Sequence, residues 1–434
     1  MTKVKVIGAG LAGSEAAWQL AQRGIEVELY EMKPLKKSPA HHSDYFAELV
    51  CSNSFRGDRL ENAVGLLKEE LRRCDSLIMS CAEQTRVEAG GCLAVDRVGF
   101  AERVTERIKH HPNITVISQE VTEVPEGPVI IATGPLTSDA LSNAIGNYFG
   151  SEHLHFFDAA APLVTADSVD MELAWWQSRY DRGTPDYINC AMNKDEYEAF
   201  VEALVNAEEA QVHGFEDKNV FEGCMPVEVM ARRGVDTLRY GPMKPVGLTD
   251  PRTGKEPYAV VQLRQDNAAK SVFNLVGFQT HLKFGEQNRV FSMIPALRSA
   301  EYVRYGVMHR NTFLQSPKLL DRFFADRRNP LVAFAGQMTG VEGYVESTAS
   351  GYLAAVAMAA KINERPIPDF PKTTAIGALG YYISDSSIEN FQPMNINFSI
   401  ITPLDKKVRK KAEKNLAISQ RSLQIVDAMV AEGI

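Results

Sequence analysis

The N-terminal run of this chain places the strongest constraint on what it can fold into. Residues 4–31 read VKVIGAGLAGSEAAWQLAQRGIEVELYE. A short apolar strand leads directly into G-x-G-x-x-G at Gly8, Gly10 and Gly13, a helix follows, and a second, alternating strand ends at Glu31. This order of strand, glycine turn, helix, strand and acid is typical of the first unit of a nucleotide-binding α/β fold.

Each part of this unit has a physical task. Gly8 permits the tight turn, Gly10 removes a side chain that would block a pyrophosphate, and Gly13 lets the helix pack against the strand. The helix N-terminus then offers N–H groups and a positive dipole end to phosphates, and an acid can accept hydrogen bonds from a ribose. The alternative is a tight turn that binds nothing. We expect a dinucleotide to contact Gly8, Ala9, Gly10, Leu11, Ala12, Gly13 and Glu31.

Two later segments favour FAD over NAD. PVIIATGPLTS (128–138) is a strand that runs into Ala-Thr-Gly, and LVAFAGQMTGVEGYVESTASGYLAAVAMAAKI (331–362) is a strand, a glycine-rich turn and an Ala-rich helix. Both resemble the later dinucleotide-contacting segments of the FAD-binding family typified by glutathione reductase. A second G-x-G-x-x-G is lacking, so NADH or NADPH would have to dock transiently. The resemblance implies FAD contacts at Thr133, Gly134, Gly336, Gln337 and, where the helix beneath the flavin begins, Gly343.

The length and the middle of the chain predict a second domain. At 434 residues the chain is too long for one ordinary core. Its central part lacks the alternation of strand and helix and holds turn signals such as TDPRTGKEP. We therefore expect an α/β fold in which residues 1–158 and 326–434 form a discontinuous FAD-binding Rossmann-like domain of the glutathione-reductase type. An inserted α+β domain for substrate or RNA would occupy residues 159–325.

Composition narrows the class of protein. A net charge of -8 with 45% hydrophobic residues indicates a globular protein without a generally basic surface for nucleic acid. Apolar runs stay well short of the ~20 residues of a membrane helix, and MTKVKVIGAG lacks a signal-peptide pattern. The six cysteines form no C-x-x-C, and the histidine pairs 41/42 and 110/111 lack partners at ligand spacing. We expect a cytoplasmic protein with reduced thiols and no metal.

Near the C-terminus the segment DKKVRKKAEKN concentrates positive charge on an expected helix. Such a run is often only a solvated face. Because the whole chain is acidic, a local basic cluster also fits a patch that contacts RNA phosphates. The residues of this basic cluster are Lys406, Lys407, Arg409, Lys410, Lys411 and Lys414.

The segment FEGCMPVEVMARRG (221–234) raises a question about Cys224. A lone cysteine is usually a small buried hydrophobic residue. Arg232 and Arg233 follow closely, and they could lower the pKa of the thiol if the chain folds back. The residues alone leave both readings open.

Seven segments spread over the chain resemble the folate- and FAD-dependent tRNA (uracil-5-)-methyltransferases of bacteria. They are AELVCSNSFRGD, FFDAAAPLV, FEGCMPVEVMARRG, LRYGPMKPVGL, VRYGVMHRNTF, FAGQMTGVEGYVES and FQPMNINFS. The resemblance runs from Gly8 to beyond Phe398. It implies a flavoenzyme that methylates the T-loop uridine of tRNA, with methylenetetrahydrofolate as the one-carbon donor and NADH or NADPH as the reductant of FAD.

The resemblance also implies roles for two cysteines. The 5-position of uracil is a poor nucleophile, and a thiolate that adds to the neighbouring ring carbon converts the ring into an enolate that can attack a one-carbon electrophile. By resemblance, Cys224 is this nucleophile and Cys51 assists close to the flavin. The remaining cysteines are expected in the core: Cys74, Cys81, Cys92 and Cys190.

Five further side chains are weaker functional candidates. His309 lies among aromatic residues and could stack on the folate pterin or steer a proton, and His281 is a second choice. Lys244 and Arg304 could meet the folate glutamate or RNA phosphates, and Asp158 could contact flavin or cap a helix. For each of them a structural histidine, a surface ion pair or a simple cap is the alternative.

Three other functions stay open from the residues. The same chemistry could act on a ribosomal RNA uridine, since RNA choice depends on surface shape and charge. A flavin oxidoreductase of a small molecule would need neither the basic cluster nor Cys224. A non-catalytic RNA-binding flavoprotein would dispense with both Cys51 and Cys224. The oligomeric state is open as well.

Overall fold

The computed structural model describes residues 3–434 apart from 39, 151–153, 160, 211–224, 268, 307, 389–390 and 406–407, and only the backbone of 154–159 and 308–312. In this part of the chain the buried hydrophobic residues gather in two large cores. The first draws on residues between Val4 and Phe149 and again between Phe313 and Val426. The second draws on residues between Val164 and Leu297. The domain limits at 159 and 325 stay predictions.

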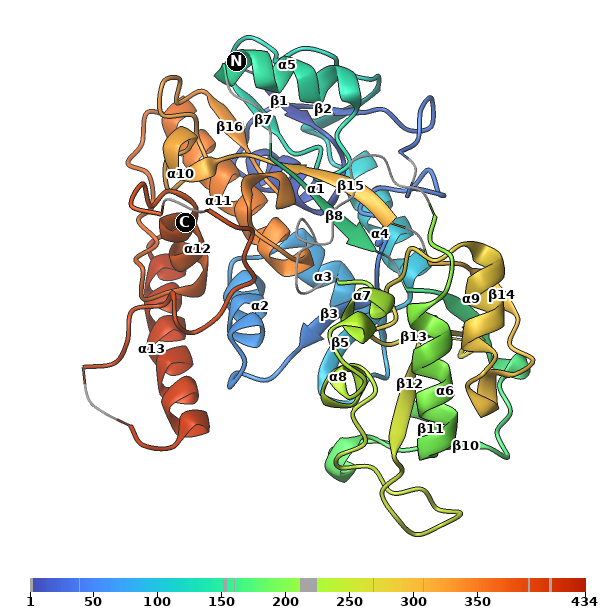
Figure 1. Ribbon diagram of the computed structural model, residues 1–434. Helices are drawn as coiled ribbons and strands as arrows, with labels where there is room; N and C mark the ends of the chain where they lie inside the picture. Colours follow the sequence, from blue (N-terminus) through green and yellow to red (C-terminus); the bar gives the residue numbers. More distant parts are fainter. Residues whose placement is uncertain are drawn as a thin grey trace.

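A parallel five-stranded sheet forms the centre of the first core (Figure 1). Its middle strand β1 (Val4–Ile7) pairs with β2 on one side and β7 on the other, so the strand order reverses at β1. Parallel strands with apolar residues on both faces are expected to be covered by helices. The order is β16 (Val332–Phe334), β7 (Val129–Ile131), β1, β2 (Val27–Glu31) and β6 (Ile114–Ser118). This sheet confirms the predicted α/β fold.

Two helices from opposite ends of the chain pack closely together in the first core. They are α1 (Leu11–Gln22) and α11 (Tyr344–Ile362). A Cβ on Gly351 of α11 would lie 2.2 Å from the carbonyl oxygen of Ala12, so a glycine is needed for this approach. The Ala-rich sequence of α11 serves the same purpose, because small side chains let two backbones come near each other.

Further helices complete the first core. A buried carboxylate, Glu70 of α2, ties three of them together, because it accepts hydrogen bonds from the N–H groups of Ala375 (2.7 Å) and Ile376 (2.8 Å) in α12 and from the hydroxyl of Ser422 in α13 (2.5 Å). The helices are α2 (Ala63–Arg73), α3 (Leu77–Gln84), α4 (Arg97–Lys109), α5 (Asp139–Phe149), α10 (Ser316–Leu319), α12 (Ala375–Ile383) and α13 (Lys411–Ala431).

The expected helix over the basic cluster begins later than the sequence suggested. α13 begins at Lys411, so Arg409 and Lys410 precede it. Lys410 is the N-cap and Lys411 the first helical residue, so positive charge still lies at the helix N-terminus, where the helix dipole opposes it. Lys406 and Lys407 lie outside the described residues.

An antiparallel sheet with strands of unequal length forms the centre of the second core. Its order is β10 (Ala174–Trp176), β11 (Tyr187–Met192), β12 (Ala259–Gln265), β13 (Val272–Leu275), β9 (Leu163–Thr165) and β14 (Tyr302–Arg304). The helices here are α6 (Lys194–Val205), α7 (Val227–Arg232), α8 (Thr237–Tyr240) and α9 (Phe284–Phe291). Strand and helix follow no βαβ alternation, in accord with the α+β character expected for this part.

Two smaller sheets complete the architecture. β8 (Leu154–Ala159) and β15 (Met308–Phe313) pair antiparallel, just before and just after the residues of the second core. The chain therefore leaves and re-enters the first core on paired strands. A three-stranded sheet, β3 (Ser54–Gly57), β5 (Cys92–Val95) and β4 (Arg86–Val87), lies between α2 and the second core (Figure 1).

Candidate functional site

A cleft opens at the carboxyl ends of the central parallel strands. Its empty volume is about 1110 Å³, part of it open to solvent, which is enough for a large ligand. It lies where the strand order reverses, and ligands of open α/β sheets bind at this place. The lining comes from the turn after β1, the end of β2, the segment after β7 and the start of α11.

The glycine turn after β1 forms the floor of the cleft. Gly8 has a φ of +94°, and a Cβ there would lie 2.9 Å from the Ala132 carbonyl oxygen. At Gly13 a Cβ would lie 1.8 Å from the Gly8 carbonyl oxygen, so this glycine serves helix packing and does not line the cleft. A Cβ on Gly10 would meet no atom within 4 Å. The space at Gly10 therefore faces the cleft rather than a described protein neighbour.

Glu31 is held rigidly at the end of β2. It is 7% exposed, and its carboxylate accepts hydrogen bonds from the N–H of Ala9 (2.8 Å) and the N–H of Lys33 (3.0 Å). Burial and two backbone donors fix the carboxylate beside the glycine turn. Glu31 lines the cleft, so an oxygen lone pair can still meet a ribose hydroxyl.

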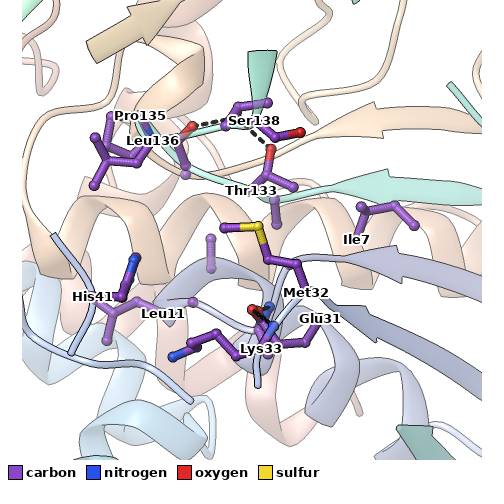
Figure 2. A pocket seen from close by; sticks show the side chains of 18 of the residues that line it. Ile7, Leu11, Glu31, Met32, Lys33, His41, Thr133, Pro135, Leu136 and Ser138 are labelled. Carbon is purple, nitrogen blue, oxygen red and sulfur yellow. Dashed lines mark hydrogen bonds between the residues drawn. The ribbon is translucent and has the colours of Figure 1, made fainter. Parts of the chain in front are cut away.

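The segment after β7 forms the opposite wall. Figure 2 shows Thr133, Pro135 and Leu136 across the cleft from Glu31 and Lys33. The hydroxyl groups of Thr133 and Thr137 lie 2.6 Å apart, and Thr137 donates to the Gly134 carbonyl (2.7 Å). These bonds hold the turn after the strand in one shape.

The third wall belongs to the segment between β16 and α11. Gly336 and Gln337 line the cleft, and Gly336 has a φ of +84°. The Gln337 amide donates to Glu342 (2.7 Å). Gly343 precedes α11 with a φ of +110° and does not line the cleft, whereas its neighbour Tyr344 does.

Sequence reasoning missed several charged or titratable residues of the cleft, among them its two basic ones. Lys33 and His41 line it on the Glu31 side (Figure 2). Burial lowers the pKa of both side chains, and Lys33 further lowers that of His41. Lys33 donates to the Tyr45 carbonyl and lies 4.0 Å from Glu48. A lysine two positions after the acid of the second strand was the one signal in the sequence, and it is a weak one.

Cys51 lies beside the cleft, next to the first residue of α11. Its neighbour Val50 lines the cleft, and the Tyr344 hydroxyl accepts hydrogen bonds from the N–H groups of Cys51 (3.0 Å) and Ser52 (3.1 Å). Arg304 donates to the Cys51 carbonyl (3.3 Å). The structure thus brings Cys51 and Arg304 together, although 253 positions separate them.

Cys224 lies outside the described residues, so the structure does not place it. The helix that follows it in the sequence, α7, is described, and Arg232 of this helix forms an ion pair with Glu209. Burial lowers the pKa of Arg232. Arg233 is exposed at the end of α7.

His281 occupies a buried position in the second core. Its Nδ1 lies 2.6 Å from Glu228 and its Nε2 lies 3.0 Å from Glu209, and the side chain is 1% exposed. This burial between two carboxylates favours the structural reading of His281 over contact with a substrate. Lys244 is exposed after α8.

For two of the weaker candidates only the backbone is described. His309 in β15 pairs with Asp158 in β8, so these two positions face each other across the short ladder. Their side chains lie outside the described part of the structure. The pairing places them at the passage between the two cores.

The remaining cysteines differ in burial. Burial raises the pKa of Cys74 and Cys190 to about 12 and that of Cys81 to about 11, as for inert core thiols. Cys92 is only half-buried, at the start of the middle strand β5 of the small sheet, and this differs from the expected core position.

The described part of the basic cluster lies away from the second core. Arg409, Lys410 and Lys411 are exposed at the start of α13, on the opposite side of the view from β10–β14 (Figure 1). Within the described residues no three His, Cys, Asp or Glu side chains are placed to hold a metal ion. In the same residues no helix is long and apolar enough to cross a membrane.

Comparisons with known proteins agree on one family. Residues 3–366 match the family model described as glucose inhibited division protein A. The chain is similar to the methylenetetrahydrofolate–tRNA-(uracil-5-)-methyltransferase TrmFO of Acetivibrio thermocellus, with 60% identity over 430 residues that cover 99% of each chain. It is 57% identical to the protein of the same name from Enterococcus faecalis over 98% of this chain and 97% of that one.

Among solved structures, GidA of Aquifex aeolicus has a similar fold. In its form II crystal the TM-score is 0.73 at 14% identity, over 98% of this chain and 73% of that chain. A likeness at this identity concerns the fold alone. It extends over both cores of the present structure.

Proposed function

We propose a function from one premise. The chain belongs to the family described as glucose inhibited division protein A and, by its identity to their members, to the methylenetetrahydrofolate–tRNA-(uracil-5-)-methyltransferases. The protein methylates the 5-position of the T-loop uridine in tRNA. The observation that carries this proposal is the similarity at 60% identity over 99% of both chains, because it includes the cleft and the second core together.

FAD is the cofactor that fits the cleft. By helix geometry the first N–H groups of α1 have no partner within the helix, and they point toward the space left free at Gly10. A pyrophosphate suits this place, with Glu31 at a ribose and the segment around Gly336 along the rest of the molecule. Lys33 adds a positive charge on the same side. When bound, FAD supplies transfer of hydride equivalents.

The co-substrates follow from the oxidation state of the product. Methylenetetrahydrofolate donates carbon at the level of formaldehyde, so a methyl group requires two further electrons, which NADH or NADPH provides. The G-x-G-x-x-G turn occurs once in the sequence and is part of the cleft. The nicotinamide nucleotide therefore docks transiently. Because the substrate is tRNA, the protein works in the bacterial cytoplasm.

The two cysteines divide the covalent chemistry. The Cys224 thiolate adds to the 6-position of uracil, and the electron pair of the 5,6 double bond moves into the ring as an enolate. The 5-position then forms a bond to the one-carbon unit, the bond from this carbon to folate nitrogen breaks, and tetrahydrofolate leaves. The two electrons from NADH or NADPH reach the carbon as a hydride equivalent and complete the methyl group. Loss of the proton at the 5-position expels the thiolate and restores the double bond. Cys51 assists beside the cleft, where the backbone around it is fixed by Tyr344.

We assign RNA recognition to positively charged, exposed side chains that lie away from the cleft. Arg409, Lys410 and Lys411 contact phosphates, together with Lys406 and Lys407 of the same cluster. Lys244 and Arg304 were further candidates for phosphate or for the folate glutamate. Lys244 is exposed and suits this role, whereas Arg304 is engaged at Cys51.

One experiment tests the reaction, the donor and the substrate together. Purified protein is incubated with an unmodified tRNA transcript, labelled methylenetetrahydrofolate and NADPH, and the nucleosides of the digested tRNA are identified by mass. We expect labelled 5-methyluridine. Label on ribosomal RNA fragments but not on tRNA would show that the protein methylates a ribosomal RNA uridine instead. NADPH oxidation without label on either RNA would favour an oxidoreductase of a small molecule.

Variants test the nucleophile. Cys224→Ala should abolish methylation and keep FAD bound, and Cys51→Ala should slow it severely. Cys92→Ala is the matched control, because this cysteine is also half-buried but lies in the small sheet. If Cys224→Ala still methylates tRNA, Cys224 is not the nucleophile. The assignment of FAD to the cleft would not be affected.

A further inference from the structure

The loop that carries Cys51 is clamped by side chains of the second core. Arg264 at the end of β12 donates to the Ser52 hydroxyl (2.6 Å), and Asn53 donates to the Gln265 carbonyl (3.0 Å). Arg304 of β14 donates to the Cys51 carbonyl (3.3 Å). These contacts come from two strands of one sheet. The position of Cys51 beside the cleft thus depends on the second core as much as on the first.

Two arginines contact this loop, Arg97 at the Leu49 carbonyl and Arg304 at the Cys51 carbonyl, and they differ in how their charge is balanced. Arg97 of α4 forms a two-point ion pair with Asp266, with Nη2–Oδ1 at 2.8 Å and Nε–Oδ2 at 3.1 Å. Among the described residues the Nε of Arg304 is buried and has no hydrogen-bond partner, and no carboxylate forms an ion pair with Arg304. Burial lowers the pKa of Arg304, and Arg97 lowers it further.

Among the described side chains the local charges do not cancel. Arg97 and Arg304 are positive, and both oxygens of Asp266 are occupied by Arg97. A buried cation needs an anion close by. Besides Asp266, the described acidic groups that interact with both arginines are Cys51 and Tyr344. Either of them would add negative charge near Arg304 on losing its proton.

Tyr344 is the poorer candidate for this anion. Burial raises its pKa, and the neighbouring Cys51 raises it further. Its oxygen already accepts two backbone hydrogen bonds, which hold the side chain in place. The Cys51 thiol is partly exposed and can lose its proton to solvent.

We propose that Arg304, backed by Arg97, is the positioning residue that keeps Cys51 ionised as a thiolate at neutral pH. Thiols next to arginines are ionised more readily, since the cation stabilises the sulfur anion. Arg264 of β12 donates to Ser52, the residue after Cys51, and adds a further positive charge beside the loop. Asp266, which follows the same strand, carries a negative charge and so opposes the ionisation of Cys51. The second core therefore sets the reactivity of a thiol that belongs to the first.

The role of Cys51 in turnover rests on the proposed function. The ionisation of Cys51 does not depend on that function and can be tested separately. Alkylation tests the ionisation in the absence of tRNA and folate. The full-length protein with its bound flavin is treated with iodoacetamide at pH values between 6 and 9, and the rate at Cys51 is read from its peptide by mass. A thiolate displaces iodide, whereas a thiol does not react at a useful rate.

In the wild type we expect a rate at Cys51 that changes little between pH 7 and 9. Arg304→Gln should lower the rate at pH 7 severalfold, because a pKa raised toward that of an ordinary thiol leaves only a minor fraction of thiolate at pH 7. Arg304→Lys, which keeps the charge, should restore most of the rate. Arg298→Gln, an exposed arginine of the same core, is the control and should leave it unchanged.

Two results would overturn the proposal. One is a wild-type rate that rises about tenfold per pH unit between 6 and 8, as for an ordinary thiol. The other is an Arg304→Gln profile that coincides with the wild type. The wild-type profile decides even if Arg304→Gln does not fold. Loss of methylation on tRNA with a flat alkylation profile would instead count against the proposed function alone.

Discussion

Arg97 of α4 and Asp266, which follows β12, form a two-point ion pair across the boundary between the two cores. The side chains are 12% and 6% exposed. Arg97 also donates to the Leu49 carbonyl, so one guanidinium joins the second core, α4 and the Cys51 loop. A second ion pair, Lys270 with Glu88, spans the same boundary, but its side chains are 50% and 60% exposed.

These two pairs predict very different effects on stability. Asp266→Asn should lower the free energy of unfolding by about 3–5 kcal/mol, because it leaves the buried Arg97 without its partner. Lys270→Ala should lower it by at most about 1 kcal/mol, since an exposed pair is screened by water. Urea unfolding measures both. Equal losses in the two variants would show that the buried pair does not hold the cores together.

The glycines of the first turn predict a separation between folding and FAD binding. Gly13→Ala would place a Cβ 1.8 Å from the Gly8 carbonyl oxygen, so the helix must move and the protein should lose about 1–3 kcal/mol or fail to fold. Gly10→Ala meets no protein atom within 4 Å. We expect this variant to keep its stability without flavin and to bind FAD more than about tenfold more weakly.

Thermal unfolding of the flavin-free protein and FAD titration measure the two effects. Gly285→Ala is the matched control, because its Cβ also meets nothing within 4 Å but lies in α9, away from the cleft. Its stability should stay equal or rise slightly with the better helix propensity. FAD affinity unchanged in Gly10→Ala would mean that no phosphate approaches that glycine.

The buried carboxylate Glu70 predicts a pH dependence of stability. Burial raises its pKa to about 7, against the hydrogen bonds from Ser422, Ala375 and Ile376, which lower it. The folded protein therefore holds a proton that the unfolded chain releases near pH 4.5. The stabilisation is complete below that pH and is lost as the pH rises through about 7.

Glu70→Gln should remove this component. Between pH 5 and 7 the wild type should lose up to about 1.4 kcal/mol per pH unit relative to the variant. Urea unfolding at several pH values gives the difference. Glu69→Gln, the next residue on α2 with a more exposed side chain, should keep the wild-type slope. Parallel curves for wild type and Glu70→Gln would show that Glu70 stays ionised in the folded protein.

Local sequence patterns predicted the parts of the structure that form from neighbouring residues. The strand, glycine turn and helix around Gly8 depend on contacts within one βαβ unit, and the observed sheet and cleft confirm them. The resemblance to the tRNA (uracil-5-)-methyltransferases is confirmed by the relatives of that name. The start of the helix after Gly343 also follows from its local glycines.

Long-range contacts were beyond the reach of the sequence. Nothing in the residues around Arg304 indicates that β14 would pack against the Cys51 loop, because the pairing depends on how two cores meet. His281 was considered for a substrate contact. In the structure it is buried and lies against Glu209 and Glu228, which are far from it in the chain. Lys33 and His41 reach the cleft through a loop without regular secondary structure.

The basic cluster at α13 gives the last prediction, which concerns RNA binding alone. Arg409 and Lys411 are exposed at the start of this helix, and phosphate contacts depend on salt through counterion release. The double variant Arg409→Gln with Lys411→Gln should raise the KM for tRNA with little change in kcat. Each lost phosphate contact should also lower the slope of log binding constant against log salt by about 0.7–0.9. Filter binding at several salt concentrations measures this slope.

The control for this prediction has to keep the net charge of the double variant. Lys194 and Lys255 are exposed lysines of the second core, and neutralising both removes the same charge at a distance from α13. If only the variant at α13 changes the slope, the cluster contacts RNA directly. If both pairs change it equally, tRNA responds to overall charge, and the residues at the start of α13 are a solvated face. Because cleft residues stay intact in both variants, FAD content should be the same in each.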